Sequence, residues 1–280
     1  MITLYLSLSR IKYFFRHASL PAKTGLKKSI FSHFCSTFVI NEIFTHMSIE
    51  KLKAELLAAG DENKARELLR FFKTGKGDYG EGDQFIGVTV PTNRAITRRY
   101  LHLPSRQLAS LLLSEIHELR LSALIAMVEQ YKSRQTSGEQ RQEIVDIYIA
   151  HTRYINNWDL VDLSVYHIIG AHLLHRDRSL LYRWADSTLL WEQRMAIVAT
   201  MWFIRHGEYD DTIRLAERLC HHPHDLMQKA VGWLLREVGK RDMKRLTDFL
   251  DKNYTTLPRT LLRYAIEKFP TELRKHYMAR

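Results

Sequence analysis

A tryptophan and an aspartate at helical spacing form the pattern in this sequence that is best suited to chemistry. Residues 157–162 read Asn-Trp-Asp-Leu-Val-Asp, so Trp158 and Asp162 lie four positions apart. On a helix, residues at this spacing share one face. An indole ring can stack on a sugar or base and attract a cation, and a carboxylate can stabilise positive charge or orient a water molecule. The pair therefore indicates a site for a cationic or sugar-like ligand, unless the tryptophan belongs to the core and the aspartate to the surface.

Two later segments carry basic residues that could act beside this pair. Residues 191–194 read Trp-Glu-Gln-Arg at an expected helix start, where Arg194 could hold a phosphate or pair with a carboxylate, unless it forms only an ordinary surface ion pair. Residues 229–241 combine Trp233, two glycines and a basic helix face. This composition suits contact with DNA, although it also fits a packed helix whose basic face is solvated. The glycines lower helix stability and could permit close approach of a neighbouring helix or a ligand backbone. The candidate phosphate contacts are Arg194, Lys229, Arg236, Lys240, Arg241, Lys244 and Arg263.

A cluster of cysteine and histidine is the one segment whose residue types suit a transition metal. Residues 220–225 read Cys-His-His-Pro-His-Asp, but these ligands are consecutive, and no second pair follows at the spacing of a zinc site. We therefore expect a loop between helices here, with no metal and no cofactor. The only other cysteine is Cys35, so a disulfide scaffold is excluded and a reducing compartment is favoured.

Composition limits the class of protein to which these residues belong. The chain has 280 residues, 45% of them hydrophobic, which is typical of a globular protein. Its net charge of +11 and its pI near 9.6 favour a polyanionic partner, either nucleic acid or an anionic membrane surface. No apolar run reaches transmembrane length. Glycine (12) and proline (6) are both scarce, which favours helices over a turn-rich β fold.

The first 46 residues differ from the rest of the chain. They carry six lysines and arginines against one acid, Glu42. Three interpretations are open: an upstream extension with Met47 as the real start, a transit-like presequence, or a loosely structured arm that contacts anions. We place this atypical extension at residues 1–46 and the folded domain at 47–280. The domain alone carries 36 basic and 30 acidic residues, a net charge of +6.

Hydrophobic periodicity predicts helices throughout the domain. The glycine-rich stretch 75–82 lacks the Lys-Ser/Thr ending of a P-loop, and we interpret it as a flexible connection. Many helices of 10–18 residues with short connections predict an all-α protein, an α-solenoid of stacked antiparallel helix pairs with a concave face. Pro91 is expected at the first turn of a further helix. The periodic segments are 49–59, 62–73, 105–117, 119–134, 138–152, 157–174, 188–205, 208–220, 224–240, 242–252 and 258–269.

Four segments together resemble one known family. The stretches 158–162 (WDLVD), 191–197 (WEQRMAI), 228–237 (QKAVGWLLRE) and 258–265 (PRTLLRYA) resemble the AlkD-like DNA alkylation-repair glycosylases, which are HEAT-like helical-repeat proteins. The similarity extends from about Ile49 to the C terminus. Each segment is weakly specific alone, but the first three occur in the order and near the separations of the family.

The resemblance implies a function and a set of site residues. It implies a monofunctional glycosylase that removes cationic alkylated purines, such as 3-methyladenine and 7-methylguanine, from double-stranded DNA. By motif, Asp162 corresponds to the family's catalytic aspartate, Trp158 and Trp233 to its tryptophan pair, and Arg194 to its arginine, all on a basic concave groove. We therefore expect a monomeric, cytoplasmic, nucleoid-associated DNA repair enzyme that does not bind membranes.

The match departs from the family pattern in two places. An aromatic pair expected just before the third motif is replaced by His224-Asp225-Leu226, and the aromatic expected in the second helix could be Phe71 or Phe72. Two other functions therefore stay open. One is a non-catalytic relative that binds bent or branched DNA, and the other is a helical scaffold for an acidic protein.

Overall fold

The computed structural model describes residues 48–279, which belong to one compact unit, Met47–Arg280. The proposed N-terminal extension, residues 1–46, lies outside the described residues, so all three interpretations of it remain untested. Over the described range there is no β-strand, and one isolated backbone bridge joins Gln84 to Ile116. None of the helices in this range has the length and apolarity needed to cross a bilayer.

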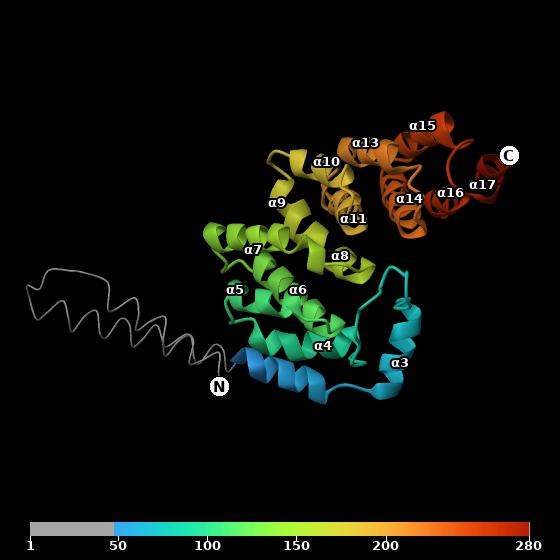
Figure 1. The fold of residues 1–280 in the computed structure, drawn as a ribbon. Helices are drawn as coiled ribbons and strands as arrows, with labels where there is room; N and C mark the ends of the chain where they lie inside the picture. Colours follow the sequence, from blue (N-terminus) through green and yellow to red (C-terminus); the bar gives the residue numbers. More distant parts are fainter. Residues whose placement is uncertain (1–47, 280) are drawn as a thin grey trace, which may run out of the picture. The chain divides into compact units, whose positions relative to one another are not determined.

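The described chain is a succession of short and medium helices (Figure 1). It begins with a helix over residues 48–58. The elements that follow are α3 (Glu62–Phe71), α4 (Val90–Thr97), η1 (Arg98–Tyr100), α5 (Ser105–Leu108), η2 (Ala109–Leu113), α6 (His117–Lys132), α7 (Gly138–Ala150), η3 (Thr152–Tyr154), α8 (Trp158–Val165), the π-helix η4 (Tyr166–Gly170), α9 (Ala171–Leu173), α10 (Ser179–Ala185), α11 (Leu190–Ala199), α12 (Met201–Arg205), α13 (Asp210–Leu219), α14 (Asp225–Gly239), α15 (Met243–Asn253), α16 (Arg259–Ala265) and α17 (Thr271–Met278).

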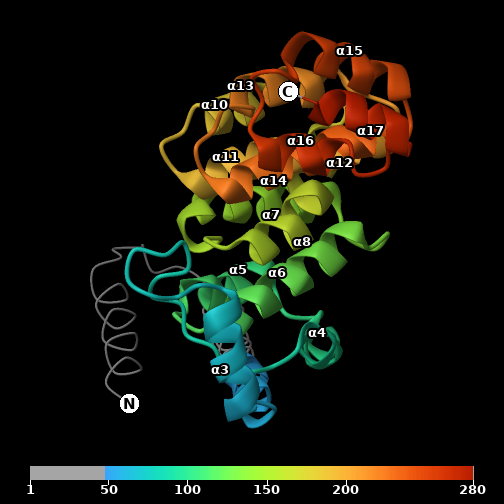
Figure 2. The same ribbon diagram turned by 90° about the vertical axis from the view of Figure 1, so that its right-hand side faces the viewer.

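The helices of this unit stack as two rows (Figures 1 and 2). In one row α4, α6, α8, α11, α14 and α16 each contact the next. In the other row α7 packs on α6, α10 on α11, and α13 and α15 on α14. Each pair buries its apolar faces against its neighbours, as expected for a helical-repeat solenoid. The predicted all-α solenoid class is confirmed.

Two helices escaped the sequence prediction, and two predicted helices are divided, one of which is 105–117, where α5 is followed by the 3-10 helix η2. Helices α10 and α17 have seven and eight residues and no side-chain hydrogen bond at their N-caps, so neither gives a strong start signal. The predicted helix 188–205 is separated into α11 and α12 at Thr200. The Thr200 hydroxyl donates to the Ile197 carbonyl at 2.6 Å, a local bond that competes with the regular helical ladder. Pro91 does occupy the first turn of α4, as expected.

Helix α6 lies at the centre of the core. Every residue of α6 from His117 to Val128 is buried, which explains why this helix shows almost no amphipathic pattern.

Helix α14 packs closely on α16. A Cβ atom at Gly232 would lie 2.5 Å from the Leu261 carbonyl oxygen and 2.6 Å from the Tyr264 Cβ. Gly232 therefore permits close contact between two helices, which is one of the two roles expected for the glycines of this segment.

Candidate active site

Asp162 and Arg194 form a bidentate ion pair between α8 and α11. Arg194 Nε donates to Asp162 Oδ1 at 2.9 Å, and Nη2 donates to Oδ2 at 2.7 Å. A third nitrogen, Nη1, donates to the Leu226 carbonyl at 2.5 Å. The side chain of Arg194 is 6% exposed and that of Asp162 is 20% exposed. Each guanidinium nitrogen therefore has a partner, so Arg194 pairs with a carboxylate, one of the roles expected for it, but as a buried pair rather than an ordinary surface ion pair.

Burial raises the pKa of the Asp162 carboxyl, while the Arg194 guanidinium opposes that rise. Asp159, one helical turn away, adds to the rise by like-charge repulsion. Two parallel charge-assisted hydrogen bonds fix the plane of the carboxylate and favour its ionised form. The pair thus holds a negative charge in a defined orientation.

Trp158 lies at the start of α8 and is held by an aromatic cluster. The Asn157 side chain accepts a hydrogen bond from the Trp158 backbone N–H at 2.8 Å, which starts the helix at this residue. Phe72 stacks on the indole with centroids 5.4 Å apart, and Phe71 meets it edge-on at 5.9 Å. Both phenylalanines that the sequence offered are therefore in contact with Trp158. Phe71 is 61% exposed, whereas Phe72 is buried.

The glycine-rich stretch 75–82 is an ordered turn that contributes a site residue. Gly77 and Gly82 have φ values of 81° and 87°, a conformation that glycine adopts without strain. Tyr79 projects from this turn and meets Trp191 and His224 edge-on, at 6.1 and 6.5 Å. Burial raises the pKa of the Tyr79 hydroxyl, and its hydrogen bond with Trp158 opposes the rise. Sequence reasoning missed Tyr79, because the stretch was interpreted only as a connection, although binding residues are often found on loops.

The four residues assigned to catalysis line a single cavity of about 940 Å³. Trp158 and Asp162 come from α8, Arg194 from α11 and Trp233 from α14. Their positions lie 75 residues apart along the chain at the extremes, so the stacking of successive helix pairs is what unites them. The remaining lining residues are Phe71, Lys73, Gly77, Asp78, Tyr79, Pro223, His224, Asp225, Leu226, Lys229, Arg236 and Tyr264. The segment His224-Asp225-Leu226, where the familial aromatic pair is missing, is thus part of the cavity wall.

Only part of the basic set expected to bind DNA reaches this cavity. Lys229 and Arg236 line it and are paired with Asp225 and Glu267, the former at 2.6 Å. Lys240 and Arg241 both pair with Glu237, and Lys244 pairs with Asp248 at 2.7 Å. Arg263 is exposed and has no ion pair among residues 48–279. These last four residues lie outside the cavity, so they could contact only DNA that extends beyond it.

A buried polar network fixes the start of α8 from behind the cavity. His117 Nε2 lies 2.9 Å from Asp159 Oδ2, and His117 Nδ1 lies 3.2 Å from Asp83 Oδ2. Arg120 donates to Asp83 at 2.6 Å, and the Asn157 amide donates to the same carboxylate at 3.2 Å. The network links α6 and the loop before α4 to the N-cap of α8. It therefore sets the direction in which Trp158 and Asp162 point.

The histidine of this network, His117, is protonated. Burial alone would lower the pKa of His117, but Asp159 and Asp83 raise it to about 9. Burial would likewise raise the pKa of Asp83, yet its bonds to His117 and Arg120 lower it. Both groups are therefore charged at neutral pH. Sequence reasoning did not identify this network, because its members are 76 positions apart at the extremes and follow no motif.

The cysteine and histidine segment forms the connection from α13 to α14. Cys220 is buried, and burial raises the pKa of its thiol. His222 Nδ1 accepts from the His224 backbone N–H at 3.0 Å, and His224 Nδ1 accepts from the Leu226 N–H at 3.1 Å. The two imidazoles thus satisfy backbone donors at the start of α14, where side-chain acceptors stabilise a helix. The expected interhelix loop is present.

Comparisons with known proteins agree with this architecture. The chain superimposes on a structure described as a predicted DNA alkylation repair enzyme from Enterococcus faecalis with a TM-score of 0.60 and 15% sequence identity, covering 76% of this chain and 97% of that one. At that identity the likeness concerns the fold. No curated protein matches the chain. The family model for DNA alkylation repair enzymes, however, matches residues 52–269, which contain all the cavity residues described above. The chain therefore belongs to the DNA alkylation repair enzyme family.

Proposed function

We propose that this protein is a monofunctional DNA glycosylase that excises cationic alkylated purines, of the 3-methyladenine and 7-methylguanine type, from double-stranded DNA. The observation that carries the proposal is the Asp162 carboxylate, held by Arg194 and directed at a cavity with Trp158 and Trp233 in its walls. An anion between aromatic faces is complementary to a positively charged sugar. Family membership supports a role in DNA alkylation repair.

In the proposed reaction the enzyme hardly needs to protonate the leaving base. An alkylated purine already bears a positive charge, so cleavage of its bond to C1′ releases a neutral base. The electrons of that bond leave with the base, and the deoxyribose becomes an oxocarbenium ion. Water then adds to C1′ and loses its proton to the carboxylate or to solvent. Asp162 stabilises the cation, and a unit charge about 4 Å away contributes roughly 4 kcal/mol at an effective dielectric of about 20.

Arg194 and the tryptophans have supporting roles in this proposal. Arg194 opposes the burial-induced rise in the pKa of Asp162 and so favours the ionised carboxylate. Because two of its bonds fix the carboxylate and the third anchors the guanidinium to the Leu226 carbonyl, the negative charge is oriented before substrate binds. Trp158 and Trp233 would contact the deoxyribose and add cation–π attraction to the developing charge. Tyr79 would limit how Trp158 can move.

DNA binding is proposed to rest on phosphate contacts rather than on base sequence. Contacts to phosphates next to the lesion are proposed for Lys229 and Arg236, a proposal supported by their position in the cavity lining. Further phosphate contacts are proposed for Lys240, Arg241, Lys244 and Arg263. Each phosphate neutralised in duplex DNA should contribute about −0.9 to the slope of log affinity against log salt. A protein that acts in this way would work as a monomer in contact with the nucleoid.

The test replaces the charge of Asp162 and keeps its shape. Asp162→Asn should lower the single-turnover release of 7-methylguanine from methylated duplex DNA by roughly a hundredfold or more, the usual cost of losing one strong electrostatic group. DNA affinity should stay constant or rise, because a carboxylate near phosphates repels them. Asp225→Asn is the matched control, since Asp225 lines the same cavity but pairs with Lys229 at its edge.

The same assay decides between the enzyme and a non-catalytic DNA-binding relative. If the wild-type protein binds duplex DNA tightly but releases no base, the binding protein is the correct interpretation. If Asp162→Asn retains full activity, or if Asp225→Asn loses as much, the charge of Asp162 is not what drives the reaction.

A further inference from the structure

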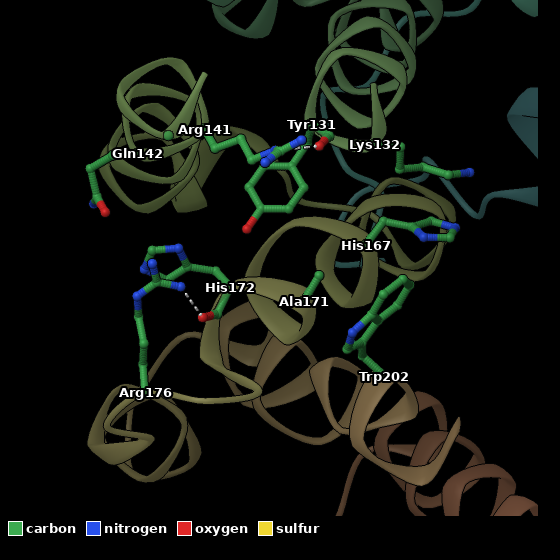
Figure 3. Close-up of a pocket in the computed structure, with 10 residues that line it drawn as sticks. Tyr131, Lys132, Arg141, Gln142, His167, Ala171, His172, Arg176 and Trp202 are labelled. Atoms are coloured by element: carbon green, nitrogen blue, oxygen red, sulfur yellow. Dashed lines mark hydrogen bonds between the residues drawn. The ribbon is translucent and has the colours of Figure 1, made fainter. Parts of the chain in front are cut away.

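A second cavity lies at the opposite end of the helix that carries the candidate catalytic pair. Elements α8, η4 and α9 form one continuous helix over residues 158–173. Trp158 and Asp162 are at its N-terminal end, whereas His167 and His172 are in its last two turns and line a cavity of about 520 Å³ (Figure 3). The C-terminal end of α6, the start of α7 and Trp202 of α12 complete the walls. This cavity shares no lining residue with the candidate active site.

The lining of this second cavity is cationic. Lys132, Arg141 and Arg176 line it, and none of its lining residues is an aspartate or a glutamate. Lys132 is exposed and forms no ion pair with any described residue. Figure 3 shows Arg176 and His172 on one side of Tyr131 and Arg141, and Lys132, His167 and Trp202 on the other side. A hollow with several basic groups and no carboxylate is complementary to an anion.

The C-terminal ends of two helices offset part of this positive charge, but not all of it. Arg141 donates to the carbonyls of Tyr131 and Ser133 at 3.0 and 2.8 Å, and Arg176 donates to the His172 carbonyl at 2.8 Å. Both arginines thus cap C-terminal helix ends, each of which carries about half a negative charge. Two such ends, those of α6 and α9, offset roughly one positive charge. Three cationic side chains exceed this amount, so positive charge remains for a ligand.

His167 has a hydrogen-bonding atom with no partner. Its Nδ1 is buried and makes no hydrogen bond to any described residue. The ring lies 4.0 Å from that of Tyr166 and meets Trp202 edge-on at 5.8 Å, so its position is fixed by packing. It belongs to the π-helical turn Tyr166–Gly170, and such turns are frequent at functional sites. A buried polar atom without a partner is costly unless a ligand or a water satisfies it.

The imidazoles would respond to an anion by taking up a proton. Burial, together with the nearby cations Lys132, Arg205 and Arg94, lowers the pKa of His167 to about 4. Burial and Arg176 also lower the pKa of His172, against the opposing effect of Asp146. An anion in the cavity would reverse the sign of the local potential. Protonated imidazole would then be favoured, with both ring nitrogens as donors.

We propose that this second cavity binds a phosphate group beside His167, with Lys132 as its cationic ligand and His167 as a proton-linked donor, while Arg141 and Arg176 add positive charge to the cavity wall. The group could belong to a free nucleotide or to the backbone of bound DNA. Trp202 offers an aromatic surface for a base in the first case. The site does not depend on the chemistry proposed for Asp162, and its test does not require base excision.

The experiment measures anion binding by calorimetry with inorganic phosphate and with sulfate, which stays dianionic over the pH range used. Saturable binding is expected to be about tenfold weaker in Lys132→Met, the usual effect of losing one charge-assisted hydrogen bond. Lys51→Met is the matched control, because Lys51 is an exposed lysine remote from the cavity lining and should bind as the wild type does. Repeating the sulfate titration in buffers of different ionisation enthalpy should reveal proton uptake that is lost in His167→Phe.

Two outcomes overturn the proposal: no saturable binding of either anion at millimolar concentrations, or equal weakening in Lys132→Met and Lys51→Met. The source of the phosphate is decided by further arms with deoxyadenosine monophosphate and undamaged duplex DNA. A nucleotide site predicts tighter binding of the mononucleotide than of sulfate, with loss of that advantage in Trp202→Leu. A backbone site predicts that sulfate competes with duplex DNA at matched ionic strength, and that Lys132→Met removes the competition.

Discussion

The two ends of the helix 158–173 carry side chains of opposite charge, and these side chains differ in whether they have ion-pair partners. At its N-terminal end, Asp159 and Asp162 each face a buried cation from a neighbouring helix, His117 and Arg194. At its C-terminal end, cationic side chains surround a cavity with no carboxylate in its lining. The helix dipole explains the sign at each end. Tertiary packing explains the rest, because only the N-terminal end is matched by partners from adjacent helices.

This difference suggests two roles for charged side chains. A carboxylate with a complete set of partners is held in one orientation and can act on a transient cation, whereas cations without carboxylates remain available to a stable anion. The variants below should separate these cases, since breaking a complete pair costs folding free energy and removing an unmatched cation does not.

The largest effect on stability is expected from Arg194→Met. This change leaves the Asp162 carboxylate buried without its bidentate partner and should lower the free energy of unfolding by about 3–5 kcal/mol. Urea denaturation followed by circular dichroism measures it. Arg245→Met is the control, because the ion pair of Arg245 with Asp210 is at least half exposed and should contribute no more than about 1 kcal/mol.

A double variant sharpens this result. In Arg194→Met/Asp162→Asn the uncompensated charge is gone, so part of the lost stability should return. If Arg194→Met costs no more than Arg245→Met, the pair is not the buried, mutually dependent unit described above.

The pH dependence of stability tests the second pair, His117 with Asp159. The pKa of His117 in the folded protein, about 9, exceeds its ordinary value of 6.5, so folding favours the protonated form. The resulting stabilisation is fully present below pH 6.5 and is lost as the pH rises through 9. Its upper limit is about 3 kcal/mol. Urea midpoints measured from pH 6 to pH 10 should fall over this window in the wild type, and the fall should be much smaller in His117→Gln.

A smaller effect is expected from Tyr79→Phe. The ring and its contacts with Trp191 and His224 are retained, but the hydroxyl that bonds to Trp158 is lost. The expected cost is about 1 kcal/mol of unfolding free energy, together with a shift in tryptophan fluorescence. Tyr154→Phe, at an exposed tyrosine, serves as the control and should change neither quantity. An unchanged emission spectrum in Tyr79→Phe would show that the ordered loop does not restrain Trp158.

The smallest effect on folding is expected from Lys132→Met at the other end of the helix. Since Lys132 is exposed and forms no ion pair within the described residues, its loss should change the unfolding free energy by less than about 0.5 kcal/mol. Denaturation curves in the absence of phosphate and sulfate would measure this. A cost of several kcal/mol would mean that Lys132 is a structural residue, and the contrast between the two ends would fail.

Local sequence determined the class of the fold and the residues from which the site is built. Helical periodicity, scarce glycine and proline, and helix-start signals such as Pro91 in α4 are short-range properties, so the helices could be predicted from the chain alone. Trp158 and Asp162 could be paired for the same reason, because they lie one turn apart. The short helices α10 and α17 were missed because neither carries a strong cap signal.

Only the tertiary structure decided what each of these residues contacts. Arg194 could have held a phosphate, and it became the buried partner of Asp162 because α8 and α11 pack side by side. Tyr79 lines the cavity because the glycine-rich turn brings it against Trp191 and His224, and two carboxylates stabilise the protonated form of His117. Residue types and helix faces are encoded over a few positions, whereas charge state and partner depend on burial among elements that the chain brings together from far apart.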